Sequence, residues 1–237
     1  MTSIELARYI NHTLFKPNAT RDDLIRLCSE ARRYDFFSVC VNPTWVAFCA
    51  NLLSASRVKI CSVVGFPLGA NMAVNKANEA LTVFNLGAAE IDMVINIGAL
   101  KSGGKQIRLV EKEIQLTRTA VPEAVLKVII ETCLLNDDEK VLACEIALDC
   151  GADFVKTSTG FSTSGARPKD IALMCKVVGN QMGIEASGGI RYLATAKAML
   201  EAGATRLGCS NSVDIILETK QETRKLDSLP RNRKPQY

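Results

Sequence analysis

The chain has 237 residues, of which 48% are hydrophobic and 23% are charged, and its formal net charge is +4. This composition is typical of a globular protein. The sequence contains no basic face interleaved with aromatic residues and no apolar run of the ~18 residues that a bilayer span needs, so we expect neither a nucleic-acid nor a membrane partner.

The cysteine pattern argues against both a zinc site and a disulfide framework. The nine cysteines include no C-x-x-C pair, and His12 is the only histidine, so no Cys/His zinc set can be assembled. Most of the cysteines lie within apolar runs, as small buried hydrophobic residues do. The N-terminus carries no signal-peptide pattern. We therefore expect a metal-free protein of the reduced cytoplasm.

Taken in chain order, short runs rich in Val and Ile alternate with longer amphipathic stretches. A short amphipathic pattern around Glu5 and Arg8 predicts an additional N-terminal helix. Strands are predicted near 11–14 and at 37–41, 58–64, 90–95, 126–131, 153–156, 183–186 and 205–208. Helices are predicted at 21–33, 43–54, 72–87, 104–118, 137–149, 168–179, 192–202 and 211–219.

Eight strands alternating with helices predict an α/β fold of the (β/α)8 TIM-barrel type. The same Gly-Ala turn opens three strands, at Gly87, Gly151 and Gly203, and it favours a barrel over an open doubly wound sheet. Aromatic residues make up only 5%, so we expect an aliphatic core of the kind that fills barrel interiors. Residues 1–219 are predicted to form this single domain, and 220–237 a charged, flexible C-terminal tail.

Four charged residues fall inside or at the ends of the apolar strands: Asp92, Lys127, Lys156 and Glu185. Any one of them could point outward into an ordinary salt bridge between helices. Four buried charges in four strands are costly unless they are paired, so a shared polar centre is the simpler interpretation. In a barrel, the carboxyl ends of the strands face one common mouth, and we expect the centre to lie there.

A lysine in such a polar centre predicts covalent chemistry. A neutral lysine amine can attack a carbonyl and form an iminium, which accepts electrons when a C–C bond is made or broken. The free amine has a pKa of ~10.4, so burial or a nearby cation must lower the pKa of the nucleophile. Lys156 is the candidate nucleophile, Lys127 the candidate neighbouring cation, and Asp92 a candidate proton shuttle.

Three loops after late strands predict a phosphate site. They are 158–160, 187–191 and 208–212, and the last two lead directly into helices. Glycines let backbone amides approach an anion, and a helix N-terminus favours negative charge. The loops after strands seven and eight form the recurrent phosphate site of barrels.

Ordered motifs over about residues 3–218 resemble deoxyribose-phosphate aldolase. They lie at 11–17, 39–43, 64–69, 90–98, 126–132, 154–161 and 186–191. The resemblance implies reversible cleavage of 2-deoxy-D-ribose 5-phosphate to glyceraldehyde 3-phosphate and acetaldehyde, with no metal or other cofactor, by a homodimer. It makes Lys156 the Schiff-base lysine, Asp92 the proton relay and Lys127 a substrate and electrostatic contact. The substrate and phosphate contacts that it implies are Thr13, Cys40, Thr157, Gly160, Gly188, Gly189, Arg191, Gly208, Ser210 and Asn211.

The sequence departs from the family pattern at two positions. Glu185 stands where the family has a second catalytic lysine, and Asn11 stands where it has an aspartate. A carboxylate in place of an ammonium should make Lys156 more basic and a poorer nucleophile. Cys40 matches a family cysteine that can react with aldehydes, but it can equally be an ordinary buried strand cysteine.

Three functions therefore remain open at this point. The first is a working deoxyribose-phosphate aldolase in which Glu185 and Asp92 share proton transfer. The second is a divergent Schiff-base enzyme that acts on another aldehyde or ketone and uses Glu185 as its acid/base. The third is a non-catalytic protein that binds sugar phosphates.

Overall fold

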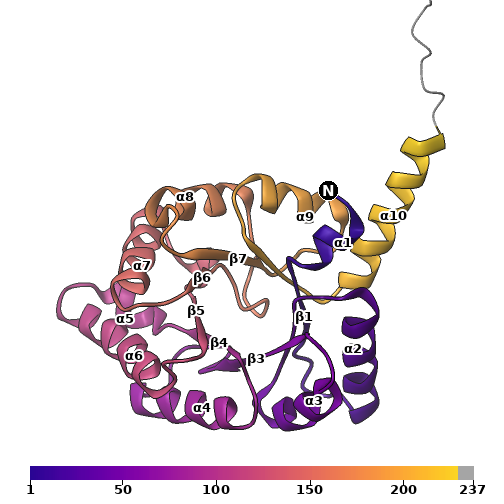
Figure 1. Ribbon diagram of the computed structural model, residues 1–237. Helices are drawn as coiled ribbons and strands as arrows, with labels where there is room; N and C mark the ends of the chain where they lie inside the picture. The colour runs from indigo at the N-terminus through magenta and orange to yellow at the C-terminus, as the bar shows by residue number, and fades with distance from the viewer. Residues whose placement is uncertain (229–237) are drawn as a thin grey trace, which may run out of the picture.

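The computed structural model describes residues 1–228, with 223–228 as backbone alone. Its centre is a closed barrel of eight parallel strands in sequence order, in which β1 pairs with both β2 and β8 (Figure 1). The strands are β1 (Ile10–Leu14), β2 (Ser38–Val41), β3 (Lys59–Val64), β4 (Glu90–Val94), β5 (Val125–Ile129), β6 (Phe154–Lys156), β7 (Gly183–Ser187) and β8 (Arg206–Cys209). The predicted (β/α)8 barrel is confirmed, and the open doubly wound sheet is ruled out.

Helices surround the barrel. They are α1 (Ser3–Ala7), α2 (Arg21–Tyr34), α3 (Val46–Leu53), α4 (Ala73–Asn85), α5 (Ile97–Ser102), α6 (Ile107–Ala120), α7 (Asp137–Asp149), α8 (Pro168–Val178), α9 (Leu193–Glu201) and α10 (Ser212–Ser228). The N-terminal helix α1 was predicted, whereas the short helix α5 was not. Within residues 1–228, no helix combines the length and apolar character needed to cross a bilayer.

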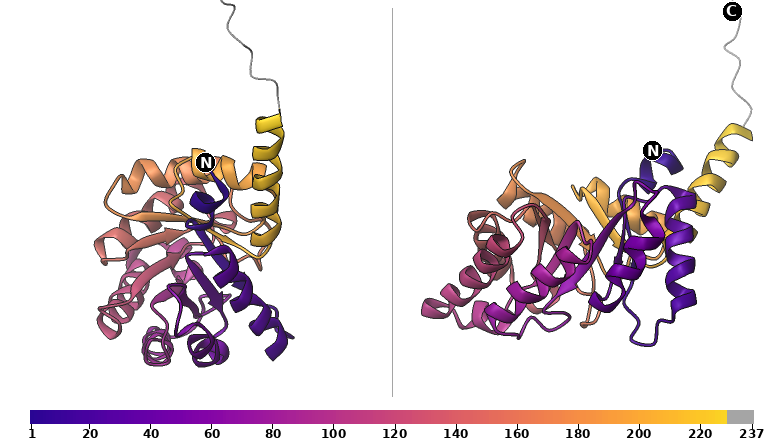
Figure 2. Two further views of the ribbon diagram at one scale, coloured as in Figure 1. Left: turned by 45° about the vertical axis from the view of Figure 1, so that its right-hand side comes forward. Right: turned by 60° about the horizontal axis from the view of Figure 1, so that its bottom comes forward.

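The last helix extends further than the sequence pattern suggested. Helix α10 packs beside α1 and runs on through 220–228, which the sequence pattern predicts as part of the C-terminal tail. Figure 2 shows its last turns extending past the edge of the barrel in both views. The rest of the expected tail, 229–237, lies outside the described residues.

Local sequence explains where several helices begin. Thr20 caps α2 by accepting a hydrogen bond from the backbone N–H of Asp23, whose carboxylate accepts one from the backbone N–H of Thr20. Asn136 and Glu139 form the same reciprocal cap at the start of α7. Such boxes satisfy two backbone donors that a helix start leaves free.

The aliphatic core lies between the sheet and the helices. Val39, Ile91, Leu126 and Val155 face outward from the strands into this layer and are fully buried. The interior of the barrel is different, because the alternate positions of the same strands carry charged and polar side chains. Aliphatic residues fill the layer between the sheet and the helices, as expected. The expectation that they also fill the barrel interior was wrong at the inward-facing positions that carry these charged and polar side chains.

Candidate active site

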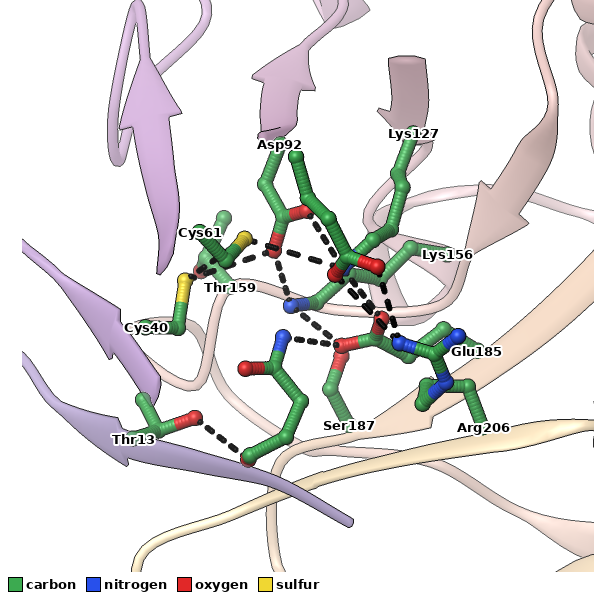
Figure 3. A network of polar contacts seen from close by, with 12 residues as sticks. Thr13, Cys40, Cys61, Asp92, Lys127, Lys156, Thr159, Glu185, Ser187 and Arg206 are labelled. Carbon is green, nitrogen blue, oxygen red and sulfur yellow. Dashed lines mark hydrogen bonds and ion pairs between the residues drawn. The ribbon is translucent and has the colours of Figure 1, made fainter. Parts of the chain in front are cut away.

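The charged side chains of four strands meet inside the barrel. Strand register places Asp92 opposite Lys127 and Lys156 opposite Glu185. Successive side chains of a strand point to opposite faces, so register partners share the inner face. Figure 3 shows all four side chains converging on one centre. The shared polar centre that the sequence predicted is present.

Lys156 is held by two carboxylates. Its Nζ lies 2.5 Å from Asp92 Oδ2 and 2.7 Å from Glu185 Oε1. Both carboxylates are fully buried. The nitrogen therefore has two proton acceptors in direct contact on its buried side.

Lys127 lies deeper and contacts three carboxylates. Its Nζ is 2.7 Å from Glu90 Oε2, 2.9 Å from Glu185 Oε2 and 3.2 Å from Asp92 Oδ1. Arg206 completes the group by pairing with Glu90 at 3.1 Å. We call Glu90, Asp92, Lys127, Lys156, Glu185 and Arg206 the charged cluster.

Glu90 and Arg206 were not among the candidate residues. Glu90 comes two positions before Asp92 in the same strand and therefore shares its face, which is a signal that the sequence offered. Arg206 opens β8 and stacks on Phe37, with its guanidinium carbon 3.5 Å from the ring centre. Its inward position depends on the barrel register and has no local signature.

Asn11 and Glu185, the two positions at which the sequence is expected to depart from the family pattern, are in contact. Asn11 Nδ2 donates to Glu185 Oε1 at 3.4 Å, and Asn11 Oδ1 accepts from Ser38 Oγ at 2.8 Å. An amide can donate to a carboxylate, whereas an aspartate at position 11 would repel it. The amide of Asn11 is thus compatible with a carboxylate at position 185.

The charged cluster is balanced, with three cations (Lys127, Lys156, Arg206) against three carboxylates (Glu90, Asp92, Glu185). Burial alone would lower the pKa of Lys156, but the carboxylates of Asp92 and Glu185 outweigh it and raise that pKa above its ordinary value. Burial would raise the pKa of Glu185, but Lys127 and Lys156 hold it well below its usual range. In the unliganded site Lys156 is therefore an ammonium and Glu185 a carboxylate.

A cavity of about 310 Å³ opens above the charged cluster. Among the candidate residues it is lined by Thr13, Lys156, Gly160, Gly188, Gly189, Arg191, Gly208 and Ser210. Of the charged cluster, Lys156 lines this cavity, and the other five residues are not part of the cavity wall. The amine is thus ion-paired below and open to a cavity of ligand size above.

Glycines shape the wall beside Lys156. A Cβ at Gly208 would lie 2.8 Å from Glu185 Oε1 and 3.4 Å from Lys156 Nζ, so a larger residue there would crowd the ion pair. Gly188 and Gly189 have φ of +83° and +77°, a region that favours glycine. Ser158 Oγ is fully buried at the cavity wall and has no hydrogen-bond partner among the described residues. A ligand oxygen could satisfy it.

Glu131 organises the loop after β6, and sequence reasoning missed it. It is buried in a left-handed conformation with φ of 54°. Its Oε2 accepts the backbone N–H of Thr159 at 3.2 Å and the hydroxyl of Thr159 at 2.5 Å. A non-glycine residue in this conformation marks a position that the surrounding structure fixes. The available signal was the charge of Glu131 at the end of the apolar run that predicted the strand 126–131.

Three candidate contacts lie outside the cavity. Thr157 is buried, and its hydroxyl donates to the carbonyl of Ser187 at 3.1 Å, which ties two of the loops together. Cys40 lies beside Asp92, behind the cavity wall. Asn211 lines a neighbouring cavity of about 750 Å³ between β1, α2 and the start of α10.

Cys40, Cys61 and Asp92 bring their donor atoms within 4.8 Å of one another. Sequence spacing could not reveal this set, because it comes from three strands. The ammonium of Lys127 lies 3.6 Å from Cys61 Sγ and 3.2 Å from Asp92, so a divalent cation would meet a positive charge already in place. The position of the Lys127 ammonium therefore argues against a metal ion bound by these three residues, and it favours Cys40 and Cys61 as free thiols.

A closed parallel barrel with its charged centre and cavity at the carboxyl ends of the strands has the form of a (β/α)8-barrel enzyme. Within that class the chain belongs to the DeoC/LacD family of aldolases, whose family model matches residues 8–214.

Individual relatives agree with this assignment. Deoxyribose-phosphate aldolase of Geobacillus sp. is 54% identical over 212 residues, which are 89% of this chain and 94% of that protein. Deoxyribose-phosphate aldolase of Halalkalibacterium halodurans is 55% identical over 222 residues, which are 93% of this chain and 98% of that protein. Among solved structures, the tetrameric deoxyribose phosphate aldolase of Aeropyrum pernix has a TM-score of 0.86 at 35% identity, covering 93% of each chain.

Proposed function

We propose that this protein is a class I aldolase that cleaves 2-deoxy-D-ribose 5-phosphate reversibly to glyceraldehyde 3-phosphate and acetaldehyde through a Schiff base on Lys156. The observation that carries the proposal is the position of that amine, with two carboxylates on its buried side and a cavity on the other. The names of relatives above 50% identity over most of the chain support the same reaction.

The two carboxylates around Lys156 supply the first proton transfer. Lys156 gives a proton to Asp92 or Glu185, and the neutral amine attacks the aldehyde carbon of the open-chain sugar. Loss of water leaves an iminium. The C2–C3 bond then breaks as the C3 hydroxyl loses its proton, and the electron pair moves into the iminium to give an enamine. Protonation of the enamine and hydrolysis release acetaldehyde and the free lysine.

The loops after β7 and β8 would hold the phosphate. Gly188, Gly189 and Ser210 line the cavity, and the loops that contain them lead into α9 and α10. Backbone amides at helix starts bind anions. Arg191 adds a cation, and the unpaired hydroxyl of Ser158 adds a buried donor.

Turnover assays test the proposal. We expect the parent to release acetaldehyde from deoxyribose 5-phosphate and Lys156→Ala to release none. Lys169→Ala, an exposed lysine on α8, is the matched control and should keep the parent rate. Equal rates in the parent and Lys156→Ala would contradict the proposal.

The ion pair between Lys156 and Glu185 favours a second candidate, a Schiff-base enzyme for another carbonyl compound with Glu185 as acid/base. Borohydride reduction with a panel of aldehydes and ketones distinguishes it, because a different compound would then give the stronger adduct on Lys156. Binding of sugar phosphates with no adduct from any compound would leave the third function, a binding protein.

We also propose that the chain forms a homodimer in a reduced cytoplasm. The nine cysteines, all free thiols, support a reducing compartment. Light scattering of the purified chain should give twice the 25.7 kDa monomer mass, and a monomer or tetramer mass would contradict the dimer.

A further inference from the structure

Two buried thiols face each other inside the barrel. Cys40 in β2 and Cys61 in β3 are register partners, and their Sγ atoms lie 3.0 Å apart. Neighbouring strands are about 4.8 Å apart, which is within the Cα separation that a disulfide bridges. The sulfurs need to approach by only about 1 Å to reach the S–S bond length of about 2.05 Å.

The surroundings of the pair are partly polar and partly apolar. Lys127 Nζ lies 3.6 Å from Cys61 Sγ, and Asp92 Oδ2 lies 3.7 Å from Cys40 Sγ. Phe15 and Phe66 pack over the two cysteines. Burial and the hydrogen bond with Cys40 raise the pKa of the Cys61 thiol, so its oxidation should be slower than that of an exposed thiolate.

We propose that Cys40 and Cys61 are a redox-reactive pair that a small peroxide converts to an intramolecular disulfide. One sulfur, as its thiolate, attacks a peroxide oxygen and breaks the O–O bond. The departing hydroxide takes up a proton as water, and a sulfenic acid remains. The second sulfur attacks the sulfenic sulfur, and its proton leaves with the hydroxyl group as water. Two thiols and one hydrogen peroxide thus give one disulfide and two waters.

The disulfide would change the contacts of Asp92, which is 2.5 Å from the amine of Lys156. Oxidation removes the thiol hydrogen that Cys40 donates toward Asp92 and ties β2 to β3 beside the charged cluster. The site is accordingly sensitive to oxidants at a position that the proposed reaction itself does not use.

Peptide mapping tests the linkage without reference to activity. Trypsin places Cys40 in peptide 34–57 and Cys61 in peptide 60–76, but 34–57 also holds Cys49. The mapping is therefore done in the Cys28→Ser/Cys49→Ser variant as well as in the parent. The reduced full-length chain is treated with hydrogen peroxide in the presence of a chelator, alkylated after denaturation and digested without reductant.

We expect a cross-linked product of peptides 34–57 and 60–76, lighter than their sum by two hydrogens and released by dithiothreitol. It should persist in Cys28→Ser/Cys49→Ser and disappear in Cys61→Ser. Recovery of both cysteines in alkylated form, or as sulfinic acids without the cross-link, would overturn the proposal. Fragment-ion sequencing of the cross-linked parent peptides distinguishes Cys40 from Cys49, so neither a poorly folded variant nor the absence of aldolase activity affects the test.

Discussion

Removing the charge of Glu185 should change the chemistry of Lys156 directly. Its carboxylate lies 2.7 Å from the amine and, together with Asp92, keeps the pKa of Lys156 raised. Glu185→Gln keeps the shape of the side chain and removes the charge. We expect the variant to form its Schiff base faster than the parent at neutral pH, because a larger fraction of the amine is neutral.

The size of the effect follows from the distance. One unit charge at 2.7 Å interacts by about 6 kcal/mol at an effective dielectric of about 20. If relaxation of the charged cluster leaves half of this, about 3 kcal/mol, the neutral fraction of the amine rises roughly 100-fold. The variant also leaves three buried cations facing two carboxylates, so we expect a loss of about 3–5 kcal/mol in unfolding free energy.

The assay is the rate of borohydride trapping with acetaldehyde at pH 7.5, with unfolding measured in parallel. Glu113→Gln is the matched control, since Glu113 is another buried carboxylate in an ion pair, 2.6 Å from Lys76 and remote from the cavity. It should lose stability without a gain in trapping. A slower rate in Glu185→Gln would refute the electrostatic reasoning and indicate that Glu185 itself carries the proton.

Three further predictions concern the same cavity. Because the neighbouring carboxylates raise the pKa of Lys156, the neutral fraction grows with pH, and the parent trapping rate should rise about tenfold per unit from roughly pH 7 to 9; a plateau in this range would contradict the raised pKa. Ser210→Asp places a negative charge at the expected phosphate end and should weaken deoxyribose 5-phosphate binding at least about tenfold by calorimetry, with little change in acetaldehyde trapping; equal losses for both ligands would contradict this assignment. Glu131→Gln weakens the acceptor that holds Thr159 and should raise the Kd of the sugar phosphate about tenfold; an unchanged Kd would contradict a positioning role.

Most of the strands could be predicted because they carry branched aliphatic residues on the face that the helices bury. The inner face could be predicted only in part. Asp92 and Lys156 are conspicuous as charges inside apolar runs, whereas Arg206 opens a strand and resembles a surface residue until the barrel register places it opposite Glu185. Helix α5 escaped prediction because its six residues are too few to display helical periodicity.

Loop positions were the hardest to predict. Thr157 and Gly160 belong to one motif, yet Thr157 turns inward to bind the Ser187 backbone while Gly160 lines the cavity. Asn211 follows Ser210 directly and faces a different cavity. Sequence indicates that such loops lie at the mouth, but the direction of each side chain depends on backbone conformation that no local pattern encodes.

The most direct test of the Schiff-base proposal is borohydride reduction in the presence of deoxyribose 5-phosphate, followed by peptide mapping of the whole chain. The proposal predicts a reduced adduct on Lys156 in the parent and none on Lys127. Unmodified Lys156 alongside bound sugar phosphate, or an adduct at another lysine, would contradict it.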